Sequence, residues 1–373
     1  MIYTFVMGPN LSVGYTQASV NYIKALQTQN IDFTLRPLGN VLNWRDAPFW
    51  TEGMGDYFIG SSMETELNIV QMTPAQLCEA PIWNGAANIA FTTFETTRIP
   101  KWIGEKLNTK YRGVLVPSQF NKEALAASGV TIPIHVVEHA IGDWWKPNED
   151  ALKEKSETYI FGYVGAWNER KNPKAVLAAY LEAFPEDNGE TALFLKTVAN
   201  KGLESFVEHE FIKGREDIWL YNELWTEEQM LWAHTLFDCY VSAHRGEGFG
   251  LGLAQSALLG KPVIYTSYSA PSEWLGTDAT HLALPYETVK VQGIANEFNL
   301  HFEGETLEWA DPSHEALVKA MRRFKTMKPK PSPQATRNLR ERLSWEKVGQ
   351  DFVNAIESIL GRELPRKKES PQT

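Results

Sequence analysis

Short apolar segments alternate with helical segments along most of this chain. Residues 1–8 (MIYTFVMG) form an apolar run that predicts a buried strand, and residues 16–29 carry apolar side chains at helical spacing. The same order returns at 88–94 (NIAFTTF), at 112–129 (RGVLVPS, then QFNKEALAASG) and at 134–141 (IHVVEHAI). Strands that alternate with helices form mostly parallel sheets with helices on both faces. The pattern therefore predicts a doubly wound α/β fold.

The length and one polar interruption predict two such domains. At roughly 150 residues per domain, 373 residues suit two domains. Residues 143–158 (DWWKPNEDALKEKSET) are polar and predict a linker. We expect a first domain over 1–150, a second over 151–343, and a last helix and tail over 344–373. Ser344 is a suitable helix cap, and Val348, Phe352, Ile356 and Ile359 form the apolar stripe of that helix.

Composition narrows the choice of partners. The net charge is −10, which opposes nonspecific attraction to nucleic acid or anionic lipid but leaves a local basic surface open. Two distant cysteines, Cys78 and Cys239, provide neither a disulfide framework nor a zinc site. No apolar run is long enough to span a membrane, so we expect a cytoplasmic protein. The mildly basic segment 101–113 (KWIGEKLNTKYRG) predicts a helix that either faces solvent or makes a weak contact with an acceptor or a membrane surface.

The segment 240–265 (YVSAHRGEGFGLGLAQSALLGKPVIY) carries the strongest chemical signal. A strand leads into a glycine-rich loop, and a helix begins near Leu251. Glycines let the backbone approach a ligand, and the N-H groups at a helix start bind anions. A sharp turn with close packing of the helix on the sheet would use the same glycines. The segment thus predicts an anion site or a tight structural turn.

The distance between Glu247 and Gln255 favours a ligand. The two residues lie about one or two helical turns apart, so both side chains could reach one molecule bound along the helix start. A carboxylate accepts hydrogen bonds from sugar hydroxyls, and a carboxamide can pair with a diol.

The segment RGEGFGLGLAQSALLGKPVI resembles the glycine-rich motif of family 4 retaining glycosyltransferases of the GT-B type. The resemblance implies that Glu247 contacts the donor sugar, and that the backbone around Gly248, Phe249, Gly250 and Leu251 approaches the sugar and diphosphate. Gln255 stands where the family has a second glutamate that binds the nucleotide ribose. Here the chain departs from the pattern, which puts the ribose contact in doubt.

Residues 159–184 (YIFGYVGAWNERKNPKAVLAAYLEAF) resemble the start of the family's donor domain. The resemblance implies that Lys171 neutralises the leaving diphosphate, with Arg170 beside it. Ala166 stands where many members carry an arginine. A solvated lysine is the alternative for Lys171, but a cation near a helix start is unfavourable unless an anion binds there.

Two residues of the first domain match less closely. GPNLSVGY resembles the loop that packs against donor phosphates, with Gly14 as the best match, and Gly14 could equally be a turn glycine. Glu95 follows a strand near the position of a catalytic-site histidine in other members, and it could equally be a surface acid at a helix start.

The resemblance implies two Rossmann-like domains that face a central cleft, with the last helix crossing back to the first domain. It implies metal-independent transfer of a sugar, with retention, from a nucleoside diphosphate sugar to a hydroxyl of a glycan, lipid-linked acceptor, small molecule or modified DNA base. The sequence offers no Asp-x-Asp motif for a metal and no evident nucleophile. A nucleotide-sugar epimerase, a phosphorylase and a non-catalytic sugar-nucleotide binding module remain alternatives.

Overall fold

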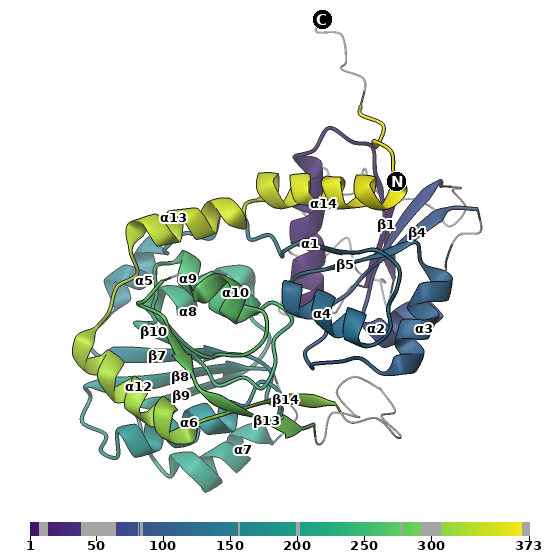
Figure 1. Cartoon of the computed structure of the whole chain (residues 1–373). Coiled ribbons are helices and arrows are strands. Elements are labelled where there is room, and N and C mark those ends of the chain that lie inside the picture. The colour runs from purple at the N-terminus through teal and green to yellow at the C-terminus, as the bar shows by residue number, and fades with distance from the viewer. Residues whose placement is uncertain are drawn as a thin grey trace, which may run out of the picture. The chain divides into compact units, whose positions relative to one another are not determined.

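The computed structural model divides the chain into two compact units, which are described separately. The first contains Met1–Gly142 and Glu341–Thr373, and the second contains Asp143–Glu297 and Thr306–Arg340. Figure 1 shows the elements of both units. The structure describes residues 1–6, 14–38, 65–80, 82, 85–155, 157–198, 202–276, 278–291 and 307–367.

The first unit is built on a parallel sheet of six strands in the order β2-β1-β3-β4-β5-β6. Its strands are β1 (Ile2–Val6), β2 (Thr34–Leu38), β3 (Leu67–Gln71), β4 (Ala87–Phe91), β5 (Gly113–Val116) and β6 (Ile134–Val136). The helices between them are α1 (Gly14–Gln27), α2 (Pro74–Glu79), α3 (Lys101–Lys110) and α4 (Gln119–Ala127). The chain runs from β1 to β2 in one direction and from β3 onward in the other. Right-handed crossovers therefore place α1 and α2–α4 on opposite faces.

The last helix, α14 (Trp345–Leu360), packs on the first unit beside α1, as the sequence predicted. Ser344 caps it by accepting a hydrogen bond from the Lys347 N-H at 3.2 Å. The predicted stripe of Val348, Phe352, Ile356 and Ile359 is buried. A side chain at Gly349 would meet the Ala25 carbonyl at 2.3 Å, so this glycine permits the close approach of the two helices.

The second unit contains a second parallel sheet of six strands, in the order β12-β11-β10-β7-β8-β9. Its strands are β7 (Tyr159–Val164), β8 (Thr191–Thr197), β9 (Ile218–Asn222), β10 (Cys239–Ser242), β11 (Val263–Thr266) and β12 (Leu282–Leu284). Counted from β7 along the chain, this is the order 3-2-1-4-5-6 of a Rossmann fold. β8 is buried throughout, as a strand covered on both faces requires.

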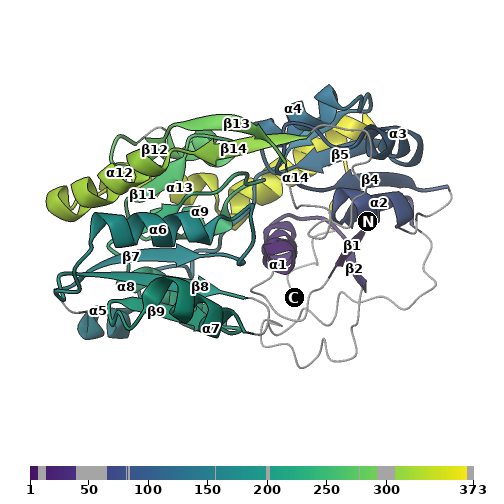
Figure 2. The ribbon, with the colours of Figure 1, turned by 90° about the horizontal axis from the view of Figure 1, so that it is seen from below.

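Helices and an antiparallel pair of short strands complete the second unit (Figure 2). The helices are α5 (Glu149–Glu154), α6 (Pro173–Ala183), α7 (Leu203–Val207), the π-helical turn η3 (Glu208–Ile212), α8 (Glu227–Leu236), α9 (Leu251–Leu258), α10 (Pro271–Leu275), α12 (His314–Met327) and α13 (Pro333–Arg342), which ends at the boundary with the first unit. β13 (Tyr286–Lys290) and β14 (Glu308–Pro312) form an antiparallel pair.

The expected linker at 143–158 is structured where the structure describes it. Trp145 is fully buried and donates from Nε1 to the Gln255 carbonyl at 2.8 Å, which fastens the segment to the second unit. Asn148 caps α5 through bonds from the N-H groups of Asp150 and Ala151. The sequence boundary expected between residues 150 and 151 thus lies inside α5, because a buried tryptophan and a helix cap outweigh the polar composition.

The fold is that of two Rossmann-like α/β domains, in agreement with the class predicted from the sequence. Across the part of the chain that the structure describes, none of the helices has both the length and the apolar character needed to cross a bilayer.

Candidate functional site

The second sheet has a topological switch point between β7 and β10. The chain continues from β7 to β8 on one side and from β10 to β11 on the other. In open parallel sheets the loops at the carboxyl ends of these two strands diverge and leave room for a ligand. Here they are residues 165–172, after β7, and residues 243–250, after β10.

Hydrogen bonds to three backbone carbonyls join these two loops. The Arg245 N-H donates to the Arg170 carbonyl at 2.7 Å. Arg170 Nη1 donates to the Gly246 carbonyl at 3.0 Å, and Asn172 Nδ2 donates to the Ala243 carbonyl at 3.0 Å. Each loop therefore fixes the backbone of the other, so side chains from residues 170–171 and 247 lie in a set geometry.

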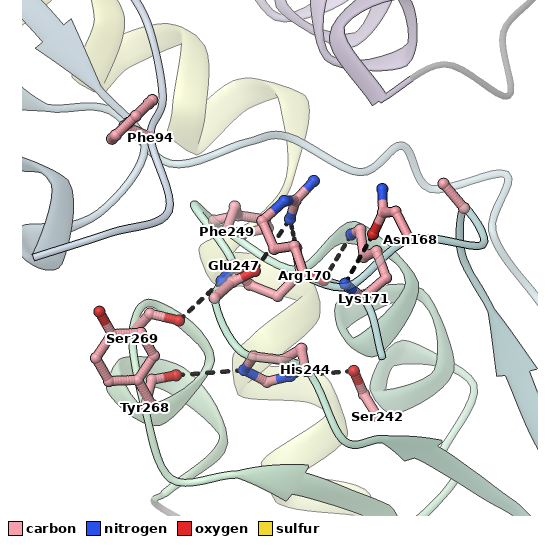
Figure 3. A network of polar contacts seen from close by, with 12 residues as sticks. Phe94, Asn168, Arg170, Lys171, Ser242, His244, Glu247, Phe249, Tyr268 and Ser269 are labelled. Carbon is pink, nitrogen blue, oxygen red and sulfur yellow. Dashed lines mark hydrogen bonds and ion pairs between the residues drawn. The ribbon is translucent and has the colours of Figure 1, made fainter. Parts of the chain in front are cut away.

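Glu247 lies at the centre of this arrangement, between two cations (Figure 3). Its Oε1 accepts a hydrogen bond from Lys171 Nζ at 2.5 Å, and its Oε2 is 3.7 Å from Arg170 Nη1. Its own N-H donates to Ser269 Oγ at 3.0 Å. Only 7% of the Glu247 side chain is exposed. The predicted residues Arg170, Lys171 and Glu247 thus meet in one buried cluster.

The cluster keeps Glu247 ionised. Burial alone would raise the pKa of this carboxyl, but the charges of Lys171 and Arg170 outweigh it and hold the pKa below its usual value. Because the pKa is lowered on folding, the contribution to stability is present above the unfolded pKa and is lost as the pH falls through the folded pKa. At neutral pH the group is a carboxylate that accepts hydrogen bonds.

The surroundings of this carboxylate favour an anion. Two cations face one carboxylate, which leaves one positive charge in excess. α9 begins at Leu251, and its first N-H groups lie at the end of the same loop. Gly250, just before it, has φ of 92°, a left-handed conformation that suits glycine. The loop thus combines a charged group for hydroxyls with N-H donors for an oxyanion.

Glycines 250 and 252 serve different purposes. A Cβ on Gly252 would lie 2.5 Å from the Tyr240 hydroxyl, so this residue allows α9 to pack on the sheet. Close packing of the helix on the sheet, the structural alternative for these glycines, therefore explains Gly252. Phe249 is buried and stacks on Trp274 of α10, with ring centroids 5.7 Å apart, which fixes the position of the loop.

Two residues beside the cluster adopt strained backbone conformations. Asn172 has φ of 53° and Ser269 has φ of 63°. Asn172 provides the bond that joins the two loops, and Ser269 holds the N-H of Glu247. Left-handed backbone costs energy for residues with a Cβ and is retained where it serves a purpose. Ser269 could not be recognised from the sequence, because it lies 22 residues from Glu247.

His244 supports the loop as a neutral side chain. Burial lowers its pKa to about 4. Nε2 faces the Tyr268 carbonyl at 3.3 Å, and a carbonyl only accepts, so Nε2 carries the proton. Nδ1 then accepts from the Ser242 hydroxyl at 3.0 Å. Both ring nitrogens are engaged, so His244 orients the loop and does not transfer a proton.

Arg245 forms a second ionic group on the outer side of the loop. Its guanidinium contacts Glu169 at 2.9 Å and Asp311 at 2.9 Å, and it lies 5.6 Å from the centre of the Trp309 ring. Its backbone N-H and carbonyl bond to Arg170 and Ala310. Arg245 therefore joins the loop after β7, the loop after β10 and β14.

A further polar group at the same edge of the sheet was missed in the sequence. Lys196 and Thr197 end β8, and they pair in register with Tyr221 and Asn222 at the end of β9. Lys196 is 2% exposed, and its Nζ lies 5.6 Å from the centre of the Trp225 ring. Thr197 Oγ1 and Asn222 Oδ1 are buried polar atoms with no hydrogen-bond partner among the described residues. The signal was a lysine inside the apolar run TALFLKT.

Burial lowers the pKa of Lys196 to about 8, although the charge of Glu223 opposes the shift. The Gly165 N-H, at the start of the loop after β7, donates to the Lys196 carbonyl at 3.0 Å. Lys196 therefore lies at the same carboxyl edge as the Glu247 cluster. Buried polar atoms without partners usually meet water or a ligand.

The remaining predicted residues are distributed as follows. Gln255 is buried in α9, and its carbonyl accepts the bond from Trp145. Gly14 is the first residue of α1, exposed, in the first unit. Glu95 is buried in the first unit, in the loop between β4 and α3. The part of the predicted loop that precedes Gly14, residues 8–13, lies outside the described residues. Their binding roles stay predictions.

Within the described ranges, no group of three or more His, Cys, Asp or Glu side chains is arranged to hold a metal ion.

Comparison with known proteins gives structural relatives. No protein-family model and no curated protein matches the sequence. The structure of sucrose-phosphate synthase from Thermosynechococcus elongatus superposes with a TM-score of 0.67 at 12% identity, over 97% of this chain and 99% of that one. A glycosyltransferase from Rickettsia africae gives 0.67 at 14% identity, over 96% and 98%. Anabaena HepE, in complex with UDP and glucose, gives 0.65 at 13% identity, over 96% and 100%. The chain has the GT-B fold of these proteins.

Proposed function

We propose that this protein is a glycosyltransferase that binds a nucleoside diphosphate sugar in its second unit and transfers the sugar to an acceptor hydroxyl. The observation that carries the proposal is the buried ionised Glu247 between Lys171 and Arg170, at the switch point of a Rossmann sheet. A carboxylate for sugar hydroxyls and cations for a diphosphate lie within one hydrogen-bonded cluster.

The diphosphate occupies the positive side of this cluster. Lys171 and the N-H groups at the start of α9 stabilise the charge that develops when the sugar leaves. Arg170 is fastened to the Gly246 carbonyl and assists mainly by position. Together these groups do the work that a metal ion does elsewhere, so the proposed reaction is independent of divalent metal.

Glu247 binds the hydroxyl groups of the donor sugar. Its lowered pKa keeps it ionised, and a hydrogen bond to an ionised acceptor is about twice as strong as one to a neutral acceptor. When the sugar binds, its hydroxyls and Lys171 share the two carboxylate oxygens. Gly248, Phe249, Gly250 and Leu251 provide the backbone along which the sugar and diphosphate lie.

The nucleoside extends toward Lys196, Thr197 and Asn222. Thr197 and Asn222 offer hydrogen bonds to the edge of a base, and Trp225 provides an aromatic surface near Lys196. Gln255 pairs with the ribose. Structures of HepE contain UDP or UDP-glucose, which supports a uridine diphosphate sugar as the first donor to test.

The transfer proceeds with retention at the anomeric carbon. The bond from carbon to the diphosphate oxygen breaks, the acceptor oxygen bonds to the same face, and the acceptor proton passes to the leaving phosphate. We assign no protein nucleophile. We propose that the first unit binds the acceptor, which is a glycan, lipid-linked acceptor, small molecule or modified base, and that Glu95 orients its hydroxyl. Gly14, which also belongs to the first unit, keeps its proposed contact with the donor phosphates.

A ligand panel tests the proposal. The purified protein is heated with UDP, GDP, ADP, TDP and CMP and with their common sugar conjugates, in the presence of EDTA. We expect one nucleoside diphosphate to raise the melting temperature, and its sugar conjugate to be consumed only when an acceptor is added. Consumption without acceptor would indicate an epimerase, and binding without turnover a binding module. No shift with any nucleotide would contradict the donor site.

A further inference from the structure

The most basic stretch of the chain lies far from the described cluster in sequence, at the junction of α12 and α13. Residues 319–337 contain Lys319, Arg322, Arg323, Lys325, Lys328, Lys330 and Arg337 and not one acidic residue. The whole chain has 46 acids and 36 bases, so this segment reverses the sign of its surroundings. Such a local field attracts an anionic partner that the protein as a whole repels.

Three of these cations have partners that hold their own helix or its neighbours in place. Lys319 pairs with Glu315 on the same helix, and Lys325 pairs with Glu190. Arg322 donates to the carbonyls of Glu182 and Ala183. These residues hold α12 and its surroundings in place.

The other four cations are exposed: Arg323, Lys328, Lys330 and Arg337. Arg337 Nη2 donates a hydrogen bond to the neutral Gln334 Oε1 at 2.7 Å, which leaves its charge uncompensated. No ion pair joins any of them to an acid among the described residues. We refer to these four residues and Met327 as the basic corner. Figure 1 shows that α12 and α13 meet there at the outer edge of the second unit.

An apolar side chain lies among these cations. Met327 is 60% exposed, the most of any large hydrophobic residue in the part of the chain that the structure describes. Arg323 Nε contacts its sulfur at 3.2 Å. A single exposed methionine is common, but one flanked by lysines combines a group for acyl chains with groups for lipid phosphates.

The backbone of the corner is stiff. Lys328 ends α12 with φ of 45°, so the chain turns there. Pro329, Pro331 and Pro333 follow at alternate positions, and proline fixes φ. Lys328 and Lys330, each followed directly by a proline, are therefore displayed on a backbone with little freedom to lose, which lowers the entropic cost of binding.

We propose that the basic corner docks on an anionic phospholipid surface, with Met327 inserted among the head groups. A nucleic acid is the less suitable partner, because proteins bind single strands by stacking bases on aromatic side chains. The only aromatic residue between 319 and 337 is Phe324, which is 4% exposed. The proposal does not depend on turnover, since it concerns a separate surface.

Co-sedimentation with lipid vesicles tests the proposal on the full chain. We expect binding to phosphatidylcholine vesicles that contain phosphatidylglycerol, weakening as salt is raised, and no binding to pure phosphatidylcholine. Each basic residue near an anionic leaflet strengthens binding about fivefold. The variant Arg323→Gln/Lys328→Asn/Lys330→Gln should therefore bind about 100-fold more weakly. Met327→Gln should bind several-fold more weakly at every salt concentration.

A matched control removes the same charge elsewhere. Lys101→Gln/Lys106→Gln/Arg112→Gln neutralises three exposed or partly exposed cations on and beside α3, the helix that the sequence marked for a weak membrane contact. We expect this control to bind within about twofold of the wild type. Equal loss in both variants would overturn the assignment to the basic corner. So would wild-type protein that ignores anionic vesicles, or that binds duplex DNA more tightly than vesicles through the same three residues.

Discussion

The two sheets of this protein handle buried polar groups differently. In the described part of the first unit, buried hydrogen bonds such as Thr4–Asn68 and Asn68–Asn88 join neutral side chains, and Glu95 is the only buried Asp, Glu, Lys or Arg. The second unit buries Arg170, Lys196, Asp217 and Glu247. Charge is costly to bury unless it is paired or has a ligand. The burial of charged groups therefore distinguishes the second sheet, and it supports the donor site that we propose there.

The strand orders explain why charged side chains gather at the switch point of the second sheet. The second sheet reverses between β7 and β10, and the loops that diverge there carry Arg170, Lys171 and Glu247. The first sheet reverses between β1 and β3, and Gly14, the first described residue after β1, is exposed. The same architecture thus provides two switch points, of which the second collects ionised groups.

The largest expected effect comes from removing the central charge. Glu247→Gln keeps the size of the side chain but leaves Lys171 and Arg170 without a counter-ion and the sugar hydroxyls without an ionised acceptor. We expect the transfer rate to fall by about 10² to 10³. The control is Glu228→Gln, an exposed acid on α8. If Glu247→Gln transferred sugar as fast as that control, the buried charges of the second sheet would have no role in transfer, and the contrast with the first sheet would have no functional meaning.

The next effect comes from the leaving-group cation. Lys171→Met should lower the transfer rate by about 10² and weaken nucleoside diphosphate binding about tenfold. Lys174→Met is the matched control, because Lys174 lies one turn further along and is half exposed. Steady-state kinetics and calorimetry separate the two effects. Equal kinetics in the two variants would show that Lys171 is only a solvated lysine.

A smaller effect concerns pH. Lys196 is charged below its pKa of about 8 and neutral above it. We expect the charged form to contact the nucleotide, so nucleotide affinity should fall about tenfold as the pH rises through that value. Lys196→Met should abolish this pH-dependent step in affinity. Lys261 has a pKa of about 8 as well but precedes β11, at the amino end of the sheet. The step should persist in Lys261→Met, and a step that survives in Lys196→Met would refute the role of Lys196.

The smallest effect is expected at Gln255. Gln255→Glu restores the residue of the resembled family, and a charged acceptor strengthens a hydrogen bond to ribose. We expect transfer to stay within about threefold of the wild type, and nucleotide affinity to be unchanged or up to tenfold higher. A large loss would mean that the amide serves a ligand other than a ribose, which binding data for several nucleotides would reveal.

The sequence predicted those features that depend on local patterns. The cap at Ser344 and the stripe of α14 follow from residues close together in the chain, and so does the start of α9 at Leu251. Two separate segments that resemble the family also selected Lys171 and Glu247, which are 76 residues apart and form an ion pair. The resemblance implied a donor-site role for each residue, but the ion pair between them is a finding of the structure, because no local pattern joins the two segments.

The features that were missed depend on contacts between distant residues. Arg245 donates a hydrogen bond to Asp311, 66 residues away in the sequence. Lys196 lies near the ring of Trp225, which belongs to the segment between β9 and α8. The polar segment 143–158 looked like a linker because its composition is polar, yet one side chain, Trp145, fastens it to the second unit. Composition does not show where a single large side chain is buried.

The most direct test of the central claim is calorimetric titration of the nucleoside diphosphate selected by the panel, with its monophosphate for comparison, in EDTA. The account predicts that the diphosphate binds at least about tenfold more tightly than the monophosphate in the wild type, and that Lys171→Met removes this difference. Equal affinities in the wild type, or a difference that persists in Lys171→Met, would contradict the claim that the cluster around Glu247 binds the diphosphate.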